Sequence, residues 1–180
     1  MIRPCTPNDN QTILAIINEA ASVYRGVIPP ECLHQPYMSM TDLNREMLDG
    51  VVFYGYEHVR RLVGVMGIQE KGPVTLIRHA YVRSDIQNHG IGTLLLCHLE
   101  TSTTRPVLVG TWEDASWAIG FYRKNGFKIV SKELSTILLQ TYWTIPQRQI
   151  ETSVVLVQKE WMRQDGSLHE RIPIPGGEGE

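Results

Sequence analysis

The 180-residue sequence lacks several features that would assign it to a special class. No apolar run approaches the ~20 residues that a membrane-spanning helix needs. Seventeen basic residues face nineteen acidic ones, so no basic field favours nucleic acid or an anionic membrane surface. The three cysteines are an odd number without CxxC spacing, which is typical of reduced thiols. We therefore expect a soluble cytoplasmic protein with neither a nucleic-acid nor a membrane partner.

Sequence motifs of several enzyme classes are also missing. The six histidines and three cysteines show neither HExxH nor paired metal-ligand spacing, so no metal is expected. No Gly-Lys pair is available for a P-loop, and Leu95 stands where a dinucleotide fingerprint starting at Gly90 would need glycine. A GxSxG elbow is absent too, which argues against an α/β-hydrolase.

The pattern of apolar residues predicts one α/β domain over residues 1–160, followed by a mobile tail at 161–180. Thr6 and Asp9 are spaced as a capping box for the first helix, and Ser39 or Thr41 is expected to cap the second. Helices are expected at 6–26, 39–50, 93–102, 114–126 and 131–143, the fourth capped by Asp114. Strands are expected at 51–57, 61–70, 74–82, 106–112, 128–130 and 148–158. Cys97 falls on the third helix and is expected in the core.

The stretch QNHGIG, residues 87–92, lies between an expected strand and an expected helix. A helix N-terminus offers unpaired backbone N–H groups and a partial positive charge, which suit a phosphate. Gly90 and Gly92 let an anion approach the backbone without meeting a β-carbon. A GxG also occurs by chance about once in a chain of this length. The stretch alone therefore predicts a pyrophosphate cradle and a merely tight turn about equally.

A second motif accompanies this turn. Q-x-x-G-x-G at 87–92, after a strand that ends in AYV, together with AIGFYRKNGF at 118–127, resembles the GNAT superfamily of N-acetyltransferases. The resemblance covers about residues 1–158. It implies a central, mostly antiparallel twisted sheet flanked by helices, with a splayed pair of parallel strands. It also implies transfer of an acetyl group from acetyl-CoA to a primary amine of a small molecule or peptide, and often a homodimer.

The resemblance assigns the donor site to the expected strand at 74–82 and to the turn that follows it. The Ala80 N–H would point at the developing oxyanion, a contact worth ~3 kcal/mol in a transition state. Asn88 and His89 stand where the family commonly has a basic residue, so backbone N–H groups would carry more of the phosphate binding. The donor-binding residues by match are Ala80, Tyr81, Val82, Gln87, Asn88, His89, Gly90, Ile91, Gly92 and Thr93.

Candidate acid and base residues follow from the same resemblance. Tyr122 matches the family's usual general acid, because a phenol can donate a proton to a departing thiolate. Its alternative reading is an aromatic core residue beside Phe121. The strand at 74–82 has no carboxylate, so His79 is the candidate base or else a hydrogen-bonded histidine of the sheet. Glu70, Glu113 and a water relay are weaker alternatives.

The acceptor site is expected in the loop before the second helix. This loop offers polar and aromatic side chains, each of which has ordinary loop packing as its alternative. They are Tyr24, Arg25, Glu31, His34 and Tyr37. The missing strand carboxylate also leaves open a non-catalytic acyl-CoA-binding sensor or interaction module, whereas the retained Tyr122 favours an enzyme.

Overall fold

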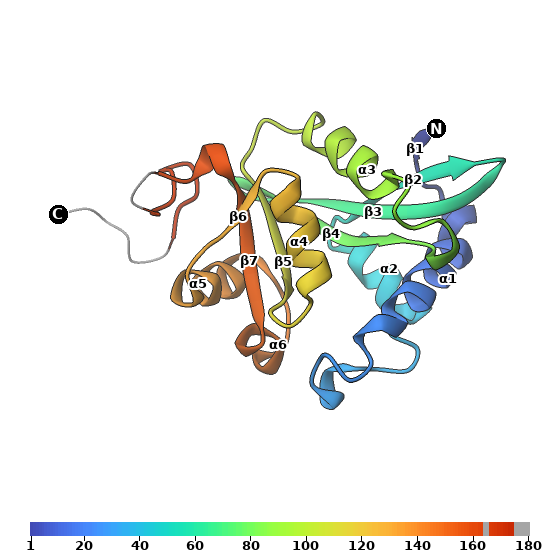
Figure 1. Cartoon of the computed structure of the whole chain (residues 1–180), viewed down its shortest axis with the longest axis horizontal. Coiled ribbons are helices and arrows are strands. Elements are labelled where there is room, and N and C mark those ends of the chain that lie inside the picture. The colour runs from blue at the N-terminus through green and yellow to red at the C-terminus, as the bar shows by residue number, and fades with distance from the viewer. Residues whose placement is uncertain (164–165, 175–180) are drawn as a thin grey trace. The chain divides into compact units, whose positions relative to one another are not determined.

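Figure 1 shows the computed structural model of the chain, which describes residues 1–163 and 166–174. The chain divides into two compact units. Unit 1 comprises Met1–Glu70 and Ile77–Thr104, and unit 2 comprises Lys71–Leu76 together with the residues from Arg105 onward. The strand Val74–Val82 is thus shared, because its first residues belong to unit 2 and its last residues to unit 1. Lys71, the last residue of the preceding strand, also belongs to unit 2.

Unit 1 contains β1 (Ile2–Pro4), α1 (Asn10–Ala20), α2 (Met40–Leu48), β2 (Val52–His58), β3 (Arg61–Lys71), the larger part of β4 (Val74–Val82) and α3 (Ile91–Glu100). Unit 2 contains the start of β4, then β5 (Val107–Trp112), α4 (Ser116–Lys124), β6 (Phe127–Ile129), α5 (Lys132–Tyr142), α6 (Gln147–Glu151) and β7 (Ser153–Gln158). These bounds confirm the expected alternation of helices and strands, apart from the differences described below and from β1, a strand that the sequence analysis did not predict.

The strands are hydrogen-bonded in the order β1-β2-β3-β4-β5-β7-β6. The pairs β1–β2, β2–β3, β5–β7 and β6–β7 are antiparallel, whereas β4 and β5 are parallel. The predicted fold class, a mostly antiparallel sheet with one parallel pair and flanking helices, is confirmed.

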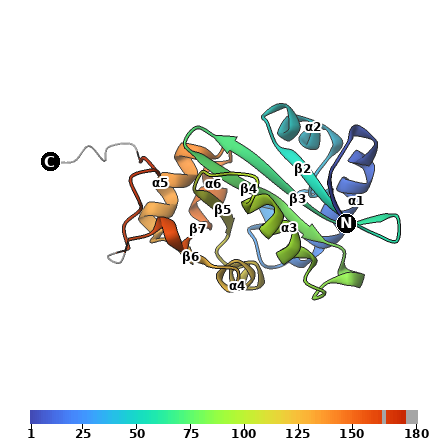
Figure 2. The same cartoon turned by 90° about the horizontal axis from the view of Figure 1, so that it is seen from above.

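Helical spacing explains the interior of unit 1. Ile13, Ile16 and Ile17 recur at intervals of three and four, so they share one face of α1, and all three are fully buried. They pack with Leu43 of α2 and Phe53 of β2 in one apolar cluster. Figure 2 shows α1 and α2 on one face of the strands of this unit and α3 on the other.

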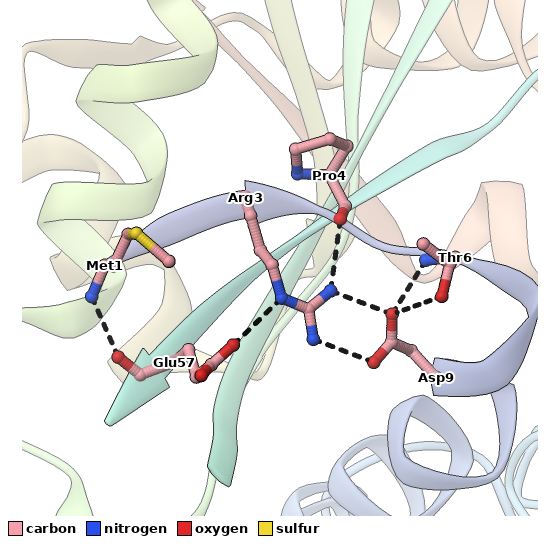
Figure 3. A network of polar contacts seen from close by, with 6 residues as sticks. All are labelled: Met1, Arg3, Pro4, Thr6, Asp9 and Glu57. Carbon is pink, nitrogen blue, oxygen red and sulfur yellow. Dashed lines mark hydrogen bonds and ion pairs between the residues drawn. The ribbon is translucent and has the colours of Figure 1, made fainter. Parts of the chain in front are cut away.

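A polar network ties the first strand of unit 1 to its neighbours (Figure 3). The Arg3 guanidinium donates to both carboxylate oxygens of Asp9 at 2.9 Å and, through Nε, to Glu57 at 2.9 Å. Asp9 also accepts from the Thr6 backbone N–H at 2.7 Å, which confirms the predicted capping box. The hydrogen bond from Arg3, above all, holds the pKa of the Asp9 carboxyl well below its usual range. This carboxylate therefore fixes both the helix start and the edge strand.

Unit 2 has its own apolar cluster. Strands β5 and β7 supply Leu108, Val155 and Val157, and α5 covers them with Leu138 and Leu139. The Ser135 hydroxyl of α5 accepts a hydrogen bond from the Val155 N–H at 3.0 Å, so a buried polar group is satisfied inside this cluster.

Three local predictions are wrong. Residues 147–151 form α6 rather than the start of the last strand, because Pro146 stands just before the helix and suits a helix start. Asp114 does not cap α4, which begins at Ser116 after a turn at Ala115. Cys97 is exposed, because the buried face of α3 is formed by Ile91, Leu95, Leu96 and Leu99. The predictions for Ser39 as a helix cap and for the strand at 74–82 are confirmed.

The expected tail begins at residue 161. Within its described part Ile172 is 3% exposed and joins the apolar cluster of unit 2, and the Pro173 carbonyl accepts from the Tyr142 hydroxyl at 2.7 Å. Residues 164–165 and 175–180 lie outside the described residues, and the mobility of the tail stays a prediction. None of the helices in the described ranges has the length and hydropathy that a bilayer crossing requires.

Candidate active site

The end of β4 and the turn that follows it lie together in unit 1. After Val82 the chain makes a short 3-10 helix, Ser84–Ile86, and then the turn at 87–90 that opens α3. The Gln87 side-chain amide donates to the Val82 carbonyl at 3.1 Å, and the Ser84 N–H donates to the Glu19 carboxylate of α1 at 3.0 Å. The turn is thereby attached to both the strand and the first helix.

Gly90 is the N-cap of α3 and has a left-handed backbone, with φ of +77°. Asn88 also has a positive φ of +64°. The Leu94 N–H donates to the Gly90 carbonyl at 3.0 Å as the first bond of the helix. The N–H groups of residues 91–93 therefore have no carbonyl within the helix to bind, and they point out of its N-terminal end. This arrangement fits both the pyrophosphate cradle and the merely tight turn that the sequence left open, and the phosphate site stays a prediction.

The orientation of His89 follows from its neighbours. Its Nδ1 lies 2.8 Å from the Gln87 carbonyl oxygen and 3.2 Å from the Ile86 carbonyl oxygen. Carbonyl oxygens only accept, so Nδ1 carries the proton and donates to them. The imidazole ring of His89 is thus held against the turn through Nδ1, which leaves Nε2 as the ring nitrogen that does not contact these carbonyl groups.

His79 lies within the continuous strand β4, just before Ala80. It has a φ of +51°, its ring stacks on Phe53 with centroids 5.7 Å apart, and its Nε2 lies 3.3 Å from Oε2 of Glu46 in α2. Burial, more than any other cause, lowers the pKa of the His79 imidazole, and the positive charge of Arg78 adds to this effect. The neutral ring that results at neutral pH is the form that can accept a proton.

The sequence reading missed the partner of His79. Glu46 follows the buried Leu43 by three positions, so it lies on the inward face of α2. A carboxylate at an inward helical position is the signal that would have pointed to it.

The expected acceptor loop contributes two of its five candidates to one aromatic cluster. The Tyr24 and Tyr37 rings stack with centroids 5.5 Å apart, and Tyr37 meets Tyr81 of β4 edge-on at 6.5 Å. Burial, first of all, raises the pKa of Tyr24 to about 12 and that of Tyr81 well above its usual value, so the phenols stay neutral. Arg25, Glu31 and His34 are instead exposed.

Tyr122 lies on α4 in unit 2 and is 6% exposed. Its ring meets Phe121 and Phe127 edge-on, with centroid distances of 4.9 Å and 5.8 Å. Such packing restricts the orientation of the phenol ring. It is also what we expect if Tyr122 is simply an aromatic core residue, the alternative that the sequence left open.

The weaker base candidates differ in their surroundings. Glu113 is held by Lys132, whose ammonium lies 2.5 Å from Oε2 and also donates to the Glu151 carbonyl at 2.6 Å. This carboxylate is thus part of an ion pair that fixes the end of α6. Glu70 is exposed. In residues 1–163 and 166–174 no three histidine, cysteine or acidic side chains are grouped so as to hold a metal ion.

Comparisons with known proteins bear on the family and the fold of this chain. Residues 49–129 match the family described as acetyltransferase (GNAT) domain. This stretch runs from β2 through β4 and the glycine turn to Tyr122 and Phe127. A search of curated protein sequences gives no significant match.

Solved structures share the fold at low sequence identity. The PaiA N-acetyltransferase from Thermoplasma acidophilum, in complex with coenzyme A, is 18% identical over 88% of this chain and 97% of that chain, with a TM-score of 0.67. The ribosomal-protein-S18-alanine N-acetyltransferase from Escherichia coli is 14% identical over 88% and 92%, with a TM-score of 0.62. A GNAT family acetyltransferase from Elizabethkingia anophelis with acetyl-CoA bound is 20% identical over 87% and 95%, with a TM-score of 0.55. The chain has the GNAT fold, and its resemblance to the GNAT superfamily is confirmed.

Proposed function

We propose that the protein is an acyl-CoA-dependent N-acetyltransferase, which transfers the acetyl group of acetyl-CoA to the primary amine of a small molecule or peptide. The observation that carries this proposal is the left-handed Gly90 at the N-terminus of α3, directly after β4 and inside the matched GNAT stretch. A backbone of this shape exposes several N–H groups to one anion.

The donor would be held by the end of β4 and by the turn. The N–H groups of residues 91–93 and the side chains of Gln87, Asn88 and His89 would bind the pyrophosphate, with the backbone of Tyr81 and Val82 along the thioester arm. The Ala80 N–H would stabilise the oxyanion, because a preorganised donor acts most strongly where charge develops.

Proton transfer is assigned to two side chains. In a direct attack the amine nitrogen bonds to the acetyl carbon, a proton leaves that nitrogen, and the thiolate leaves the carbon. Tyr122 would protonate the thiolate, and His79 would accept the proton from nitrogen. The phenol suits its task because it is a neutral acid at neutral pH.

A second candidate function is a non-catalytic acyl-CoA-binding sensor. Two observations favour it: β4 has no carboxylate, and Tyr122 is engaged in aromatic packing. The sensor would keep the donor site and transfer nothing. The homodimer and the cytoplasmic location also stay predictions.

Two measurements separate these functions. Calorimetry with coenzyme A and acetyl-CoA tests the donor site, and the absence of any binding heat would end both proposals. Release of thiol from acetyl-CoA across a panel of amines tests the transfer. We expect turnover with at least one amine and a fall in kcat of roughly ten-fold or more in Tyr122→Phe.

The control for this variant is Tyr54→Phe, which removes a phenol from β2 and is expected to leave kcat unchanged. Equal rates in wild type and Tyr122→Phe would remove Tyr122 from the mechanism. Binding without turnover over the whole panel would favour the sensor.

A further inference from the structure

Two consecutive residues of β4 contact the same carboxylate. Arg78 donates through one terminal nitrogen to Oε1 and Oε2 of Glu46 at 2.9 Å and 2.7 Å, and His79 Nε2 lies 3.3 Å from Oε2. In a regular strand successive side chains point to opposite faces of the sheet. A regular β4 could therefore not bring both side chains to one residue of α2.

The left-handed backbone of His79, with φ of +51°, removes this alternation. A non-glycine residue in this region costs on the order of 1 kcal/mol and persists only where its surroundings hold it. Gly67 of the neighbouring β3 is part of these surroundings, because a β-carbon there would lie 3.1 Å from the Arg78 carbonyl oxygen. Gly67 thus leaves room for the kink on the strand side, and Glu46 contacts both residues of the kink from the helix side.

The network around Glu46 extends through Arg78 to the neighbouring strand β3. Arg78 also donates to the Gln69 side-chain oxygen at 2.6 Å, and the Gln69 amide donates to the carbonyl and carboxylate oxygens of Asp49, both at 2.8 Å. Among the described residues, the charged groups that act on His79 are Glu46 from α2 and Arg78 from β4. Asp49, directly after α2, acts on Glu46 instead, and Gln69 of β3 links it to Arg78.

These contacts determine which nitrogen of His79 carries the proton. A carboxylate only accepts hydrogen bonds, so the contact between Glu46 and His79 favours a proton on Nε2. At 3.3 Å this contact is an ion-pair contact, and Nε2 makes no hydrogen bond within the described residues. Nε2 is fully buried, while the side chain as a whole is 15% exposed, so the exposed part of the ring excludes Nε2. Burial acts most strongly on Glu46 and would raise its pKa, but the contacts with His79 and Arg78 outweigh it, and the net direction is downward.

We infer that Glu46 is a positioning residue: it holds His79 with its proton on Nε2, so that Nδ1 is free to accept the proton of the attacking amine. The inference rests on the proposed N-acetyl transfer. As the nitrogen–carbon bond forms, the proton passes from nitrogen to Nδ1, and the Glu46 carboxylate balances the charge of the imidazolium. The carbon–sulfur bond then breaks, the thiolate takes the proton of Tyr122, and solvent returns the proton from His79 to Tyr122.

The first experiment reads the tautomer without any turnover. Nitrogen-15 NMR of histidine-labelled protein distinguishes a protonated Nδ1 from a protonated Nε2, and the His79→Gln variant assigns the signal among the six histidines. We expect His79 to carry its proton on Nε2 in the wild type and to lose this preference in Glu46→Gln. A wild-type His79 protonated on Nδ1 would overturn the inference.

The second experiment reads the role in transfer. Glu46→Gln is expected to lower kcat roughly ten-fold or more and to leave the KM for acetyl-CoA within about two-fold. It should also move the acidic limb of the pH–rate profile to lower pH, because the contact with Glu46 raises the pKa of His79 and the variant removes that charge. Arg45→Gln is the matched control, because it removes a charge from the adjacent, exposed position of the same helix. An unchanged kcat and pH profile in Glu46→Gln would also overturn the inference.

The two proposals fail in different ways. If the wild type acetylates no amine, the proposed function fails, and the NMR result alone decides whether Glu46 positions His79. If the wild type is active while Glu46→Gln is equally active, the function stands and the inference falls. A thermal melt of Glu46→Gln and Arg45→Gln before the kinetics checks that both variants are folded, so that a loss of rate is not a loss of folded protein.

Discussion

The two units differ in where their backbones are strained and where their charges are buried. All four non-glycine residues with positive φ in the described chain lie in unit 1: Val59, Arg60, His79 and Asn88. Unit 1 also contains the ion pair of Arg78 and Glu46, whose side chains are 11% and 26% exposed. The described part of unit 2 also has a large apolar cluster, but none of its non-glycine residues has a positive φ.

This difference separates turn geometry from functional strain. Val59 and Arg60 form the two-residue connection between β2 and β3, where positive φ angles match the twist of a hairpin. Asn88 lies in the turn before α3, where asparagine commonly adopts a positive φ, whereas His79 lies within β4 and has no such reason. Strained residues persist where the structure around them is over-determined, often because the strain serves a site. Unit 1 therefore contains the strained strand residue His79, and unit 2 contains the candidate acid Tyr122 among buried apolar residues.

The largest effect is expected from the core of unit 2. Phe127→Ala removes a ring that is 1% exposed and packs against Tyr122, so the free energy of unfolding should fall by about 3–5 kcal/mol. Urea denaturation measures this change. Ile129→Ala on the same strand is the control, because Ile129 is exposed and should cost much less. Similar losses in both variants would show that burial of the Phe127 ring does not set the stability of unit 2.

Gly67→Ala should destabilise unit 1 by about 2 kcal/mol through overpacking. The new β-carbon would lie 2.8 Å from a Val51 methyl carbon and 3.1 Å from the Arg78 carbonyl oxygen. Gly120→Ala in α4 is the matched control, because a β-carbon there meets nothing within 4 Å, and alanine favours a helix by about 1 kcal/mol. The midpoints of thermal or urea unfolding of the two variants should therefore shift in opposite directions. A stabilised Gly67→Ala would show that β3 does not pack closely against the Arg78 backbone.

Acid should weaken the network at the edge of unit 1. The pKa of Asp9 is lowered in the folded chain, chiefly by the hydrogen bond from Arg3, so its stabilisation is complete above the unfolded pKa near 4 and is lost as pH falls below it. Between pH 6 and pH 3 we expect Asp9→Asn to flatten the loss of stability, with a cost at neutral pH of about 1.5 kcal/mol. Parallel pH curves for wild type and variant would refute this assignment.

The smallest effect concerns the phosphate turn. His89→Arg restores a basic residue where the family commonly has one, so affinity for coenzyme A should rise about three-fold, with a steeper dependence on salt. Calorimetry at two salt concentrations measures both. His98→Arg, an exposed change near the C-terminal end of the same helix, serves as control and should leave affinity unchanged. Equal gains would mean that net charge, rather than the turn, attracts the donor.

Much of the fold could be predicted because its signals are local. Apolar spacing along α1, the capping boxes at Thr6 and Ser39, and the β-branched run of β3 each depend on residues close in sequence. The start of α6 was missed because QRQIE has no apolar period over so short a span. Burial of Cys97 was predicted from an apolar run that turned out to have one exposed face.

The candidate site divides in the same way. The turn at 87–92 could be predicted, because glycine spacing reports a backbone geometry directly. The contact of Glu46 with His79 could not be predicted, since it joins residues thirty-three positions apart. It also depends on the positive φ of His79, which the residue types at positions 78–80 do not indicate. The cluster of Tyr24, Tyr37 and Tyr81 likewise needed the tertiary structure.

The exposure of Cys97 has a practical consequence. Burial, above all, raises the pKa of the Cys5 thiol to about 11, and Cys32 is only half-exposed, so a maleimide dye at neutral pH should attach first to Cys97 on α3. A fluorophore at Cys97 would be attached to the helix whose first turn is proposed to bind the pyrophosphate of the donor. A change in its emission would then report the binding of coenzyme A or acetyl-CoA in real time, without an enzymatic assay.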